Sequence, residues 1–543
     1  MGEARSDRRD SGRSLGRKLK GRPANLAMTR AITRKGLWLW IAVLCITPLA
    51  VYWQTVFQDY GFRDDYSLLR EAHEEPFKLF RITTANGRPI YGAVLEASLR
   101  PLRFIGDLPW LRLLAVGLLA AVAAVLWRQL RRAGWSDLEA GAVALGVALL
   151  PGAQITVGWA IAWPIALALL FAVVGFSVAE AGLRRAGSVH VPSLLLGGTF
   201  YFLAGLTYQS SAMFATVPLA AVLLLRSDRE RLSHLRWIAL HLGTLLASLF
   251  AAFLLIQLFF DEGIVMEAAR MRLEPEPFTK LLWFVRQPLV NALALFELRD
   301  RFNTTAFFWV VAAAIGALLS LGYFYGAKTR SQKLRWLFCV LFLPFVAHAV
   351  SLAASSQAVG YRTVLGLSGL VLVLVVFALR SVIATRKLRP AFEVSAFASL
   401  FVVAALSAHH NAYQLIAEPQ AREWGLIQDA AKKLRFDADT DVYIIRPDID
   451  DRSTEQVFDD EFGSLSSDAD WASREMFKDA LRERFPDHLP SGSSLSIITG
   501  PTPPPSPSAY DEVVDLRKLR REGDRPLSTS AGEATTASTA SRR

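Results

Sequence analysis

Long apolar blocks, separated by short arginine-rich stretches, make up most of the chain between residues 37 and 408. A helix needs about 17 or more predominantly apolar residues to cross a bilayer, and the blocks approach or exceed that length. The pattern predicts about eleven transmembrane helices, at residues 37–53, 111–127, 138–155, 158–179, 192–207, 209–225, 237–259, 305–326, 336–353, 363–380 and 391–408. The sequence therefore predicts an all-α polytopic membrane domain.

The connections between these blocks alternate in length and charge. Those at residues 54–110, 260–304 and 354–362 are longer and carry both signs of charge. The others are short and basic, with cations at Arg128, Arg131, Arg132, Arg184, Arg185, Arg226, Arg229, Arg231, Lys328, Arg330, Lys333, Arg335, Arg386, Lys387 and Arg389. Because cytoplasmic loops concentrate Lys and Arg, we expect the basic loops and the N-terminus inside. Eleven spans then bring the C-terminus to the extracytoplasmic side.

The charge balance agrees with this orientation. The chain holds 60 Lys and Arg against 49 Asp and Glu, a formal charge of +11, yet only 20% of its residues are charged. Residues 1–36 carry 11 cations against three acids, whereas residues 409–543 carry 17 against 25. This composition excludes a soluble enzyme. It also excludes a secreted disulfide scaffold, because Cys45 and Cys339 both fall inside apolar blocks.

Four regions follow from the pattern. Residues 1–36 are expected to form a basic, disordered cytoplasmic tail, and residues 37–408 a membrane domain whose first outer loop is 54–110. Residues 409–498 alternate helical with β-rich runs such as VYIIRP, which predicts a small extracytoplasmic α/β domain. Residues 499–543 are rich in Pro, Ser and Thr and are expected to be disordered, because they cannot bury a core.

The first outer loop holds the strongest candidate for chemistry, the adjacent acids Asp64 and Asp65. Two neighbouring carboxylates repel and raise each other's pKa unless a cation or a hydrogen-bond donor lies between them. This arrangement suits a divalent metal, or a general base that deprotonates a hydroxyl. The alternative is that one of them caps a helix beginning at Tyr66, and the residues alone favour the cap. The chain has no Walker loop, dinucleotide glycine pattern, HExxH or CxxC.

Several short motifs together resemble a known superfamily. They are the acidic pair after the first span, followed by an aromatic residue and by Gly87-Arg88-Pro89, then Tyr208-Gln209 between two spans, Tyr361-Arg362-Thr363 entering a late span, and DEFGSLSS at residues 460–467. In this order they resemble the GT-C superfamily of membrane glycosyltransferases, and most of all the bacterial enzymes that glucosylate O-antigen. The matches are scattered over residues 37–470.

The resemblance implies a GT-C-like fold and an enzyme of the bacterial inner membrane. Its donor would be a sugar, such as glucose, linked to a polyprenyl phosphate, and its acceptor an extracytoplasmic envelope glycan. Membrane lipids are then partners and nucleic acid is not. Asp65, or Asp64 beside it, would be the base, and the pair is also where a divalent cation such as Mg or Mn would bind.

The resemblance also requires positive charge at the phosphate of the lipid. Arginine suits phosphate because its planar fork makes two hydrogen bonds at once. The candidates are Arg362, Arg88, Arg81 and Arg286. Arg362 opens a span and is the first choice, with an arginine that snorkels to the interface as the alternative. Tyr208 and Gln209 are candidates for sugar binding, although polar residues between spans more often hydrogen-bond another helix.

Other classes of function remain open. One is an O-antigen polymerase or ligase, which needs outer arginines more than a carboxylate pair. A second is a transporter of lipid-linked glycan, disfavoured because the sequence shows no repeated half and no acids in the middle of the spans. A third is a non-catalytic scaffold that displays the outer domain. A scaffold tolerates Asn at both Asp64 and Asp65, and a transferase does not.

Overall fold

The computed structural model describes residues 34–184, 189–228, 230, 232–266, 268, 272–301, 304–357, 360–386, 390–434, 440–447, 457–485, 495–517 and 519. Residues up to Trp40 form one unit and Ile41–Arg543 a second, and every contact below lies within the second unit. The expected disorder of the N-terminal tail falls almost wholly outside the described residues, as does that of residues 520–543.

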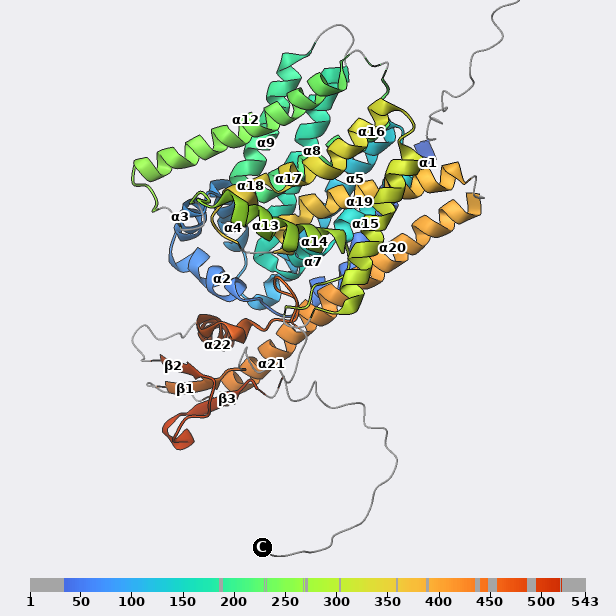
Figure 1. Ribbon diagram of the computed structural model, residues 1–543. Helices are drawn as coiled ribbons and strands as arrows, with labels where there is room; N and C mark the ends of the chain where they lie inside the picture. Colours follow the sequence, from blue (N-terminus) through green and yellow to red (C-terminus); the bar gives the residue numbers. More distant parts are fainter. Residues whose placement is uncertain are drawn as a thin grey trace, which may run out of the picture. The chain divides into compact units, whose positions relative to one another are not determined.

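Long apolar helices dominate the chain and make it a multi-pass membrane protein (Figure 1). In the described ranges, seven helical segments are long and apolar enough to cross a membrane, and the bent pair α6 and α7 raises the number to eight. The helices concerned are α1 (Arg34–Phe57), α5 (Pro109–Ala133), α6 (Asp137–Leu149), α7 (Pro151–Gly158), α8 (Trp163–Arg184), α12 (His234–Asp261), α15 (Ala306–Gly326), α19 (Tyr361–Thr385) and α20 (Pro390–Ala412).

Four of the eleven predicted spans are short or interrupted in the structure, and the first of them, 138–155, is the bent pair α6 and α7. Residues 192–207 correspond to α9 (Val191–Thr207), and 209–225 to α10 (Gln209–Ala212) followed by a 3₁₀ turn and α11 (Thr216–Leu225). The predicted span 336–353 is divided among α16 (Arg330–Leu337), a π-helical turn at Phe338–Phe342, α17 (Leu343–Ala347) and α18 (Ala349–Ala353). Pro344 lies at the start of α17, and proline has no amide hydrogen for the preceding turn. Apolar length alone cannot detect such breaks.

Helix α19 is the most deeply buried of the long helices. It packs against α15, α11, α7, α14 (Pro288–Leu293) and α6. Small residues let backbones approach closely in such bundles. A Cβ added to Gly152 of α7 would lie 2.5 Å from the Tyr361 carbonyl oxygen, so α7 touches the first turn of α19 directly.

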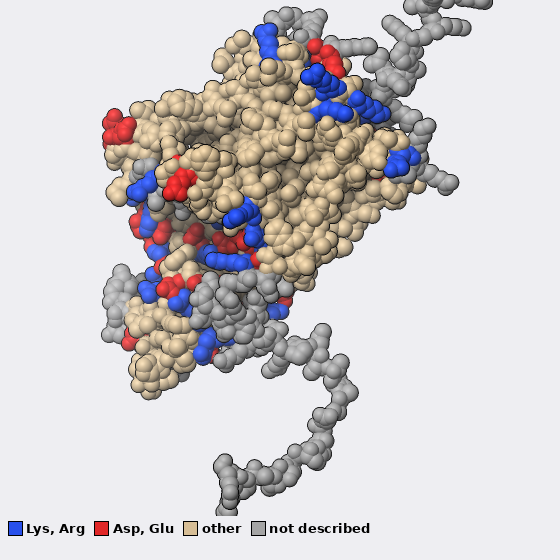
Figure 2. Space-filling view, viewed as in Figure 1, with Lys and Arg blue, Asp and Glu red and all other residues tan. Residues whose placement is uncertain are grey.

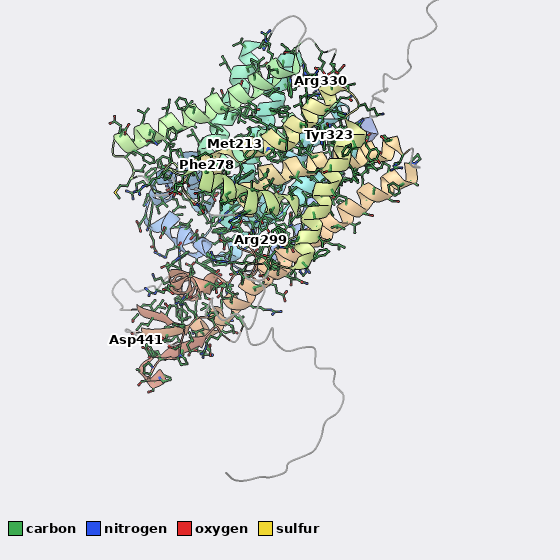
Figure 3. All side chains as sticks on the ribbon, in the orientation of Figure 1. Met213, Phe278, Arg299, Tyr323, Arg330 and Asp441 are labelled. Carbon is green, nitrogen blue, oxygen red and sulfur yellow. The ribbon has the colours of Figure 1, made fainter. Side chains whose placement is uncertain are left out.

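Short helices gather at the end of the bundle nearest the C-terminal domain (Figure 1). They are α2 (Asp64–Glu74), α3 (Lys78–Ala85) and α4 (Pro89–Leu99) of the first outer loop, together with α13 (Pro277–Arg286) and α14. Figure 2 shows an apolar band between the charged side chains at the opposite end and a mixed cluster of acids and bases here. Figure 3 labels Arg330 at that opposite end and Arg299 on this side.

The C-terminal domain is a small α/β unit. Helix α20 continues through a π-helical turn into α21 (Glu418–Lys433), and α22 (Asp470–Arg484) packs on α21. Strands β1 (Thr440–Ile445), β2 (Leu495–Gly500) and β3 (Glu512–Asp515) form a parallel sheet in the order β2-β1-β3. Thr440 is paired with Leu495, and Val442 with Glu512.

Strand β3 corrects the expected domain boundary. It lies within residues 499–543, which the composition predicts to be disordered, yet it pairs with β1 along its length. Val514 and Leu516 are buried, so this segment does contribute to a core. The proline-rich stretch at 501–509 dominates the local composition and hides the short run DEVVDL that follows it.

Candidate functional site

A cavity of about 1190 Å³ opens among the outer-loop helices, the bundle and the C-terminal domain. Its wall is apolar along α9 and α12, at Gly205, Leu249, Ala252, Phe253 and Ile256. Its other end is polar and strongly charged, with Arg63, Arg88, Gln209, Arg362, Asp459, Asp460 and Glu461. The cavity thus joins an apolar wall to an end that carries both arginines and acids.

Arg362 lies at the centre of the charged end. It stands in the first turn of α19, which begins after Gly360. Its Nη2 lies 3.4 Å from Asp460 Oδ1 and 3.6 Å from Glu461 Oε1, and its guanidinium carbon is 4.7 Å from the centre of the Trp159 ring. The side chain therefore faces the cavity and its acids instead of extending toward bulk water.

The acids come from a loop that the C-terminal domain contributes, at Asp459–Glu461. Phe458 N–H donates to the Phe462 carbonyl at 3.0 Å, and Gly463 N–H to the Leu415 carbonyl at 2.8 Å, so the loop is closed and anchored on the turn after α20. Asn291 Nδ2 donates to Asp459 Oδ2 at 3.0 Å. Burial raises the pKa of the Glu461 carboxyl, with Arg63 opposing the rise, Asp460 adding to it and Arg362 opposing it.

Arg63 joins the first outer loop to this acidic loop. Its side-chain Nη1 lies 2.7 Å from Glu461 Oε2, and its backbone N–H donates to Ser466 Oγ at 2.9 Å. Its backbone has φ 45°, in the region that side-chain-bearing residues rarely adopt. Such strain costs on the order of 1–3 kcal/mol and persists only where surrounding contacts impose it. Sequence reasoning passed over Arg63, although it directly precedes the acidic pair.

Asp65 is completely buried and bonded to the backbone. Its Oδ2 accepts from Phe62 N–H at 2.9 Å and its Oδ1 from Ile161 N–H at 3.0 Å. Burial raises the pKa of Asp65 to about 7, with Arg112 and the backbone donors opposing the rise. Neither Asp65 nor its neighbour Asp64 is among the residues that line the cavity. The Asp65 carboxylate ties the turn before α2 to the turn between α7 and α8.

Asp64 is half-buried and precedes Asp65 in the first turn of α2. The helix begins at Asp64 and not at Tyr66, and its N-cap is Arg63, which makes no side-chain cap hydrogen bond. The simple expectation that an aspartate caps this helix is therefore wrong. Burial raises the pKa of Tyr91 on α4. The nearby Arg88 and Arg362 oppose this rise, and Tyr208 and Asp64 add to it. Asp64 thus acts on the Tyr91 hydroxyl together with Arg88 and Arg362, from a position outside the cavity lining.

Arg88, Tyr208 and Gln209 meet on the other side of the cavity. Arg88 Nε donates to Gln209 Oε1 at 3.2 Å, and its guanidinium carbon is 4.3 Å from the Tyr208 ring centre. Gln209 Nε2 donates to the Gly87 carbonyl at 2.6 Å. Gln209 therefore holds the turn between α3 and α4, as a residue that links helices would, and also lines the cavity.

The structure separates two of the sequence candidates from this group. Arg81 on α3 is exposed and does not line the cavity, and neither does the exposed Arg286 at the end of α13. In the part of the chain that the structure describes, no three His, Cys, Asp or Glu side chains gather as metal ligands would. Each carboxylate oxygen of Asp65 accepts one backbone N–H, and the divalent cation expected at the acidic pair stays a prediction.

Comparison with known proteins adds a distant structural similarity. No protein-family model matches the chain, and no curated protein is similar to it in sequence. The crystal structure of the Archaeoglobus fulgidus oligosaccharyltransferase with zinc and sulfate has 13% identity and a TM-score of 0.39, over 85% of this chain and 62% of that one. The archaeal oligosaccharyltransferase AglB from the same organism, with an inhibitory peptide and a dolichol-phosphate, has 14% identity and a TM-score of 0.36, over 82% and 63%.

The apo form of the A. fulgidus oligosaccharyltransferase is similar to the same degree. It has 12% identity and a TM-score of 0.37, over 83% of this chain and 64% of that one. The chain thus spans less than two thirds of the length of these structures. Scores this low assign no substrate or residue role, and the geometry of the cavity has to support a function by itself.

Proposed function

We propose that this chain is a membrane glycosyltransferase that moves a sugar, such as glucose, from a polyprenyl-phosphate donor to an extracytoplasmic glycan acceptor. The observation that carries the proposal is the joining, in one cavity, of an arginine-rich end to an apolar wall on α9 and α12. A polyprenyl-phosphate sugar has a matching division into an anionic head and a hydrocarbon tail. A soluble sugar nucleotide would leave the apolar wall unused.

Arg362, Arg63 and Arg88 are the proposed phosphate ligands. All three line the charged end of the cavity and come from different segments of the chain. Arg362 and Arg63 share Glu461 as an ion-pair partner, which keeps both guanidinium groups in position before the donor arrives. Charge-assisted hydrogen bonds from arginine to phosphate are among the stronger polar contacts in proteins. In the reaction they would stabilise the negative charge that stays on the lipid phosphate when the sugar leaves.

Asp64 is the better candidate for the general base. Asp65 is the better candidate for a residue that holds Asp64 in position. A base must reach the acceptor hydroxyl. Asp64 is half-buried, whereas Asp65 is fully buried and holds two backbone N–H groups. In the proposed step, the acceptor oxygen forms a bond to the anomeric carbon and gives its proton to the Asp64 carboxylate. The bond from that carbon to the phosphate oxygen breaks, and the electron pair leaves with the lipid phosphate.

The direct test uses the purified protein in proteoliposomes that contain polyprenyl-phosphate-glucose. Donor binding by the wild type and by Arg362→Ala is compared with that of Arg81→Ala, because Arg81 is an exposed arginine of the first outer loop that does not line the cavity. The proposal expects a weaker affinity for Arg362→Ala and a wild-type affinity for Arg81→Ala. Equal affinities in all three would remove the cavity as the donor site.

A further inference from the structure

A second cavity lies at the other end of the bundle, among the basic loops. It measures about 460 Å³ and is bounded by the ends of α11 and α15, by α16 and by the last turns of α19. Four cations line it, against one acid: Arg226, Lys328, Arg335 and Arg380, and Asp228. Figure 3 labels Arg330, which begins α16, at this end of the molecule, away from Arg299.

Two of these arginines are buried close together. Arg226 and Arg335 have side chains that are 4% and 6% exposed, and an Arg335 Nη1 N–H donates to the Arg226 carbonyl. Within the described residues, the Nε of each is buried and has no hydrogen-bond partner. Burial of a guanidinium is costly unless an anion compensates it.

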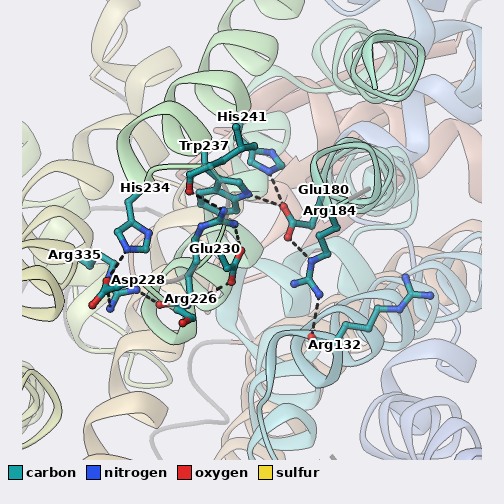
Figure 4. Close-up of polar contacts among 12 residues, drawn as sticks. Arg132, Glu180, Arg184, Arg226, Asp228, Glu230, His234, Trp237, His241 and Arg335 are labelled. Atoms are coloured by element: carbon teal, nitrogen blue, oxygen red, sulfur yellow. Dashed lines mark hydrogen bonds and ion pairs between the residues drawn. The ribbon is translucent and has the colours of Figure 1, made fainter. Parts of the chain in front are cut away.

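Two acids, Asp228 and Glu230, lie close enough to offset the charge of these arginines, and Figure 4 shows their contacts. Arg335 Nη2 lies 3.5 Å from Asp228 Oδ1, a carboxylate that also accepts from His234 and Ser331. Arg226 Nη1 pairs with Glu230, which is half exposed, at 2.8 Å. Burial lowers the pKa of both guanidinium groups, even though Glu230 opposes the fall at Arg226 and Asp228 opposes it at Arg335. Three of the four cations thus have an acid partner, because Arg380 pairs with Glu139, and among the described residues the excess positive charge of the cavity is that of Lys328.

The remaining wall is apolar in part, beside polar residues such as Ser227, Gln332 and Ser381. Leu224, Leu225, Trp336, Phe377 and Ala384 line the same space. Arg380 comes from α19 and pairs with Glu139 of α6 at 3.2 Å, so the site draws on several helices of the bundle. Basic pockets between membrane helices, closed on one side by apolar residues, are typical binding sites for anionic lipid headgroups.

We propose that this cavity binds the phosphate headgroup of an anionic membrane lipid from the leaflet at that end of the bundle. Arg335 and Arg226 contact the phosphate, Lys328 and Arg380 lie at its edge, and the acyl chains follow the apolar walls. The site is separate from the donor cavity and shares none of its lining residues. It does not depend on the proposed transferase activity. Free inorganic phosphate has the same charge chemistry but would leave the apolar walls unused.

Native mass spectrometry of the detergent-purified full-length protein tests this site. Phosphatidylglycerol and phosphatidylcholine are added at equal concentration, and inorganic phosphate is added in a separate arm. We expect one phosphatidylglycerol to be retained at least about tenfold over phosphatidylcholine. Lys328→Gln and Arg380→Gln should each lower that preference several-fold. Lys328 is exposed, so its replacement leaves the fold intact even if loss of Arg380 beside Glu139 disturbs it.

Arg330→Gln is the matched control, because Arg330 is an exposed cation two residues after Lys328 that does not line the cavity. It should keep the full preference. A loss in Arg330→Gln equal to that in Lys328→Gln would indicate only a diffuse basic surface and would overturn the proposal. Equal retention of the two lipids would also overturn it, as would inorganic phosphate binding as tightly as phosphatidylglycerol.

Discussion

The Arg63 guanidinium lies 2.7 Å from the Glu461 carboxylate, although one residue belongs to the first outer loop and the other to the C-terminal domain. Arg362 Nη2 approaches the other oxygen of Glu461, at 3.6 Å. A single carboxylate therefore holds two of the cavity arginines, one on each side. The C-terminal domain thereby completes the charged end of the cavity.

This pair should be energetically coupled. The two side chains are 25% and 10% exposed, so solvent screens the pair only partly. In a double-mutant cycle of Arg63→Ala and Glu461→Gln, we expect a coupling of about 1 kcal/mol in the free energy of unfolding. Additive single effects would mean that the two residues do not stabilise one another.

Donor binding by Arg362 should depend on the planar guanidinium group, which can make two hydrogen bonds to one phosphate. Arg362→Ala is expected to raise KM for the polyprenyl-phosphate donor by at least about tenfold, because a charge-assisted contact to phosphate is lost. Arg362→Lys keeps the charge and loses the second hydrogen bond, so it should recover only part of the affinity. Steady-state kinetics over a donor titration separates KM from kcat. Full recovery by lysine would contradict bidentate binding.

The pKa of Asp65 leads to a pH dependence of stability. Burial raises this pKa to about 7, above its ordinary value of 3.8, so the folded state binds the proton more tightly than the unfolded state. Stability from this group is fully present below the unfolded value and is lost as the pH rises through about 7. The wild type should therefore lose thermal stability as the pH rises from about 5 to about 7.5.

Asp65→Asn should flatten this slope, and thermal unfolding followed across the pH range measures it. The slope will not vanish, because burial also raises the pKa of Glu423 to about 7. Asp64→Asn is the matched control and should keep the wild-type slope. An identical slope in wild type and Asp65→Asn would show that Asp65 keeps its ordinary pKa in the folded protein.

The orientation in the membrane is a separate prediction. A reporter fused after residue 409 should report the extracytoplasmic side, and one inserted near Lys328 the cytoplasmic side. The donor cavity and the basic loops lie at opposite ends of the bundle, so the two reporters should disagree. The same side reported by both would exclude the eleven-span topology and the outward position of Asp64.

Hydropathy predicts most of the bundle because the long helices are apolar over their whole length. It fails at 336–353, where Pro344 and a π-helical turn divide an apolar run that looks continuous. It also misses β3, whose four residues, EVVD, follow a proline-rich segment. These outcomes depend on backbone hydrogen bonding and tertiary pairing, which apolar length does not report.

The sequence identifies some residues of the candidate site and misses others. Arg362, Arg88, Tyr208 and Gln209 were identified from short motifs, and all four line one cavity. The ion pair of Arg63 with Glu461 could not be predicted, because it joins segments from distant parts of the chain and depends on how the domains pack. Residue type alone also could not distinguish Asp64 from Asp65, whose roles differ through burial and through the two backbone N–H groups that Asp65 accepts.

The central claim is that Asp64 takes the proton of an acceptor hydroxyl while a sugar leaves a polyprenyl phosphate. It is tested most directly by mass analysis of the envelope glycans of cells that lack the gene and are complemented with wild type, Asp64→Asn or Arg81→Ala. Loss of the base should slow transfer by about 10²–10⁴-fold. We therefore expect wild type and Arg81→Ala to restore the mass of one sugar to the glycan, and Asp64→Asn, inserted at the same level, to leave it missing. Full restoration by Asp64→Asn, or no difference between wild type and the deletion, would contradict the claim.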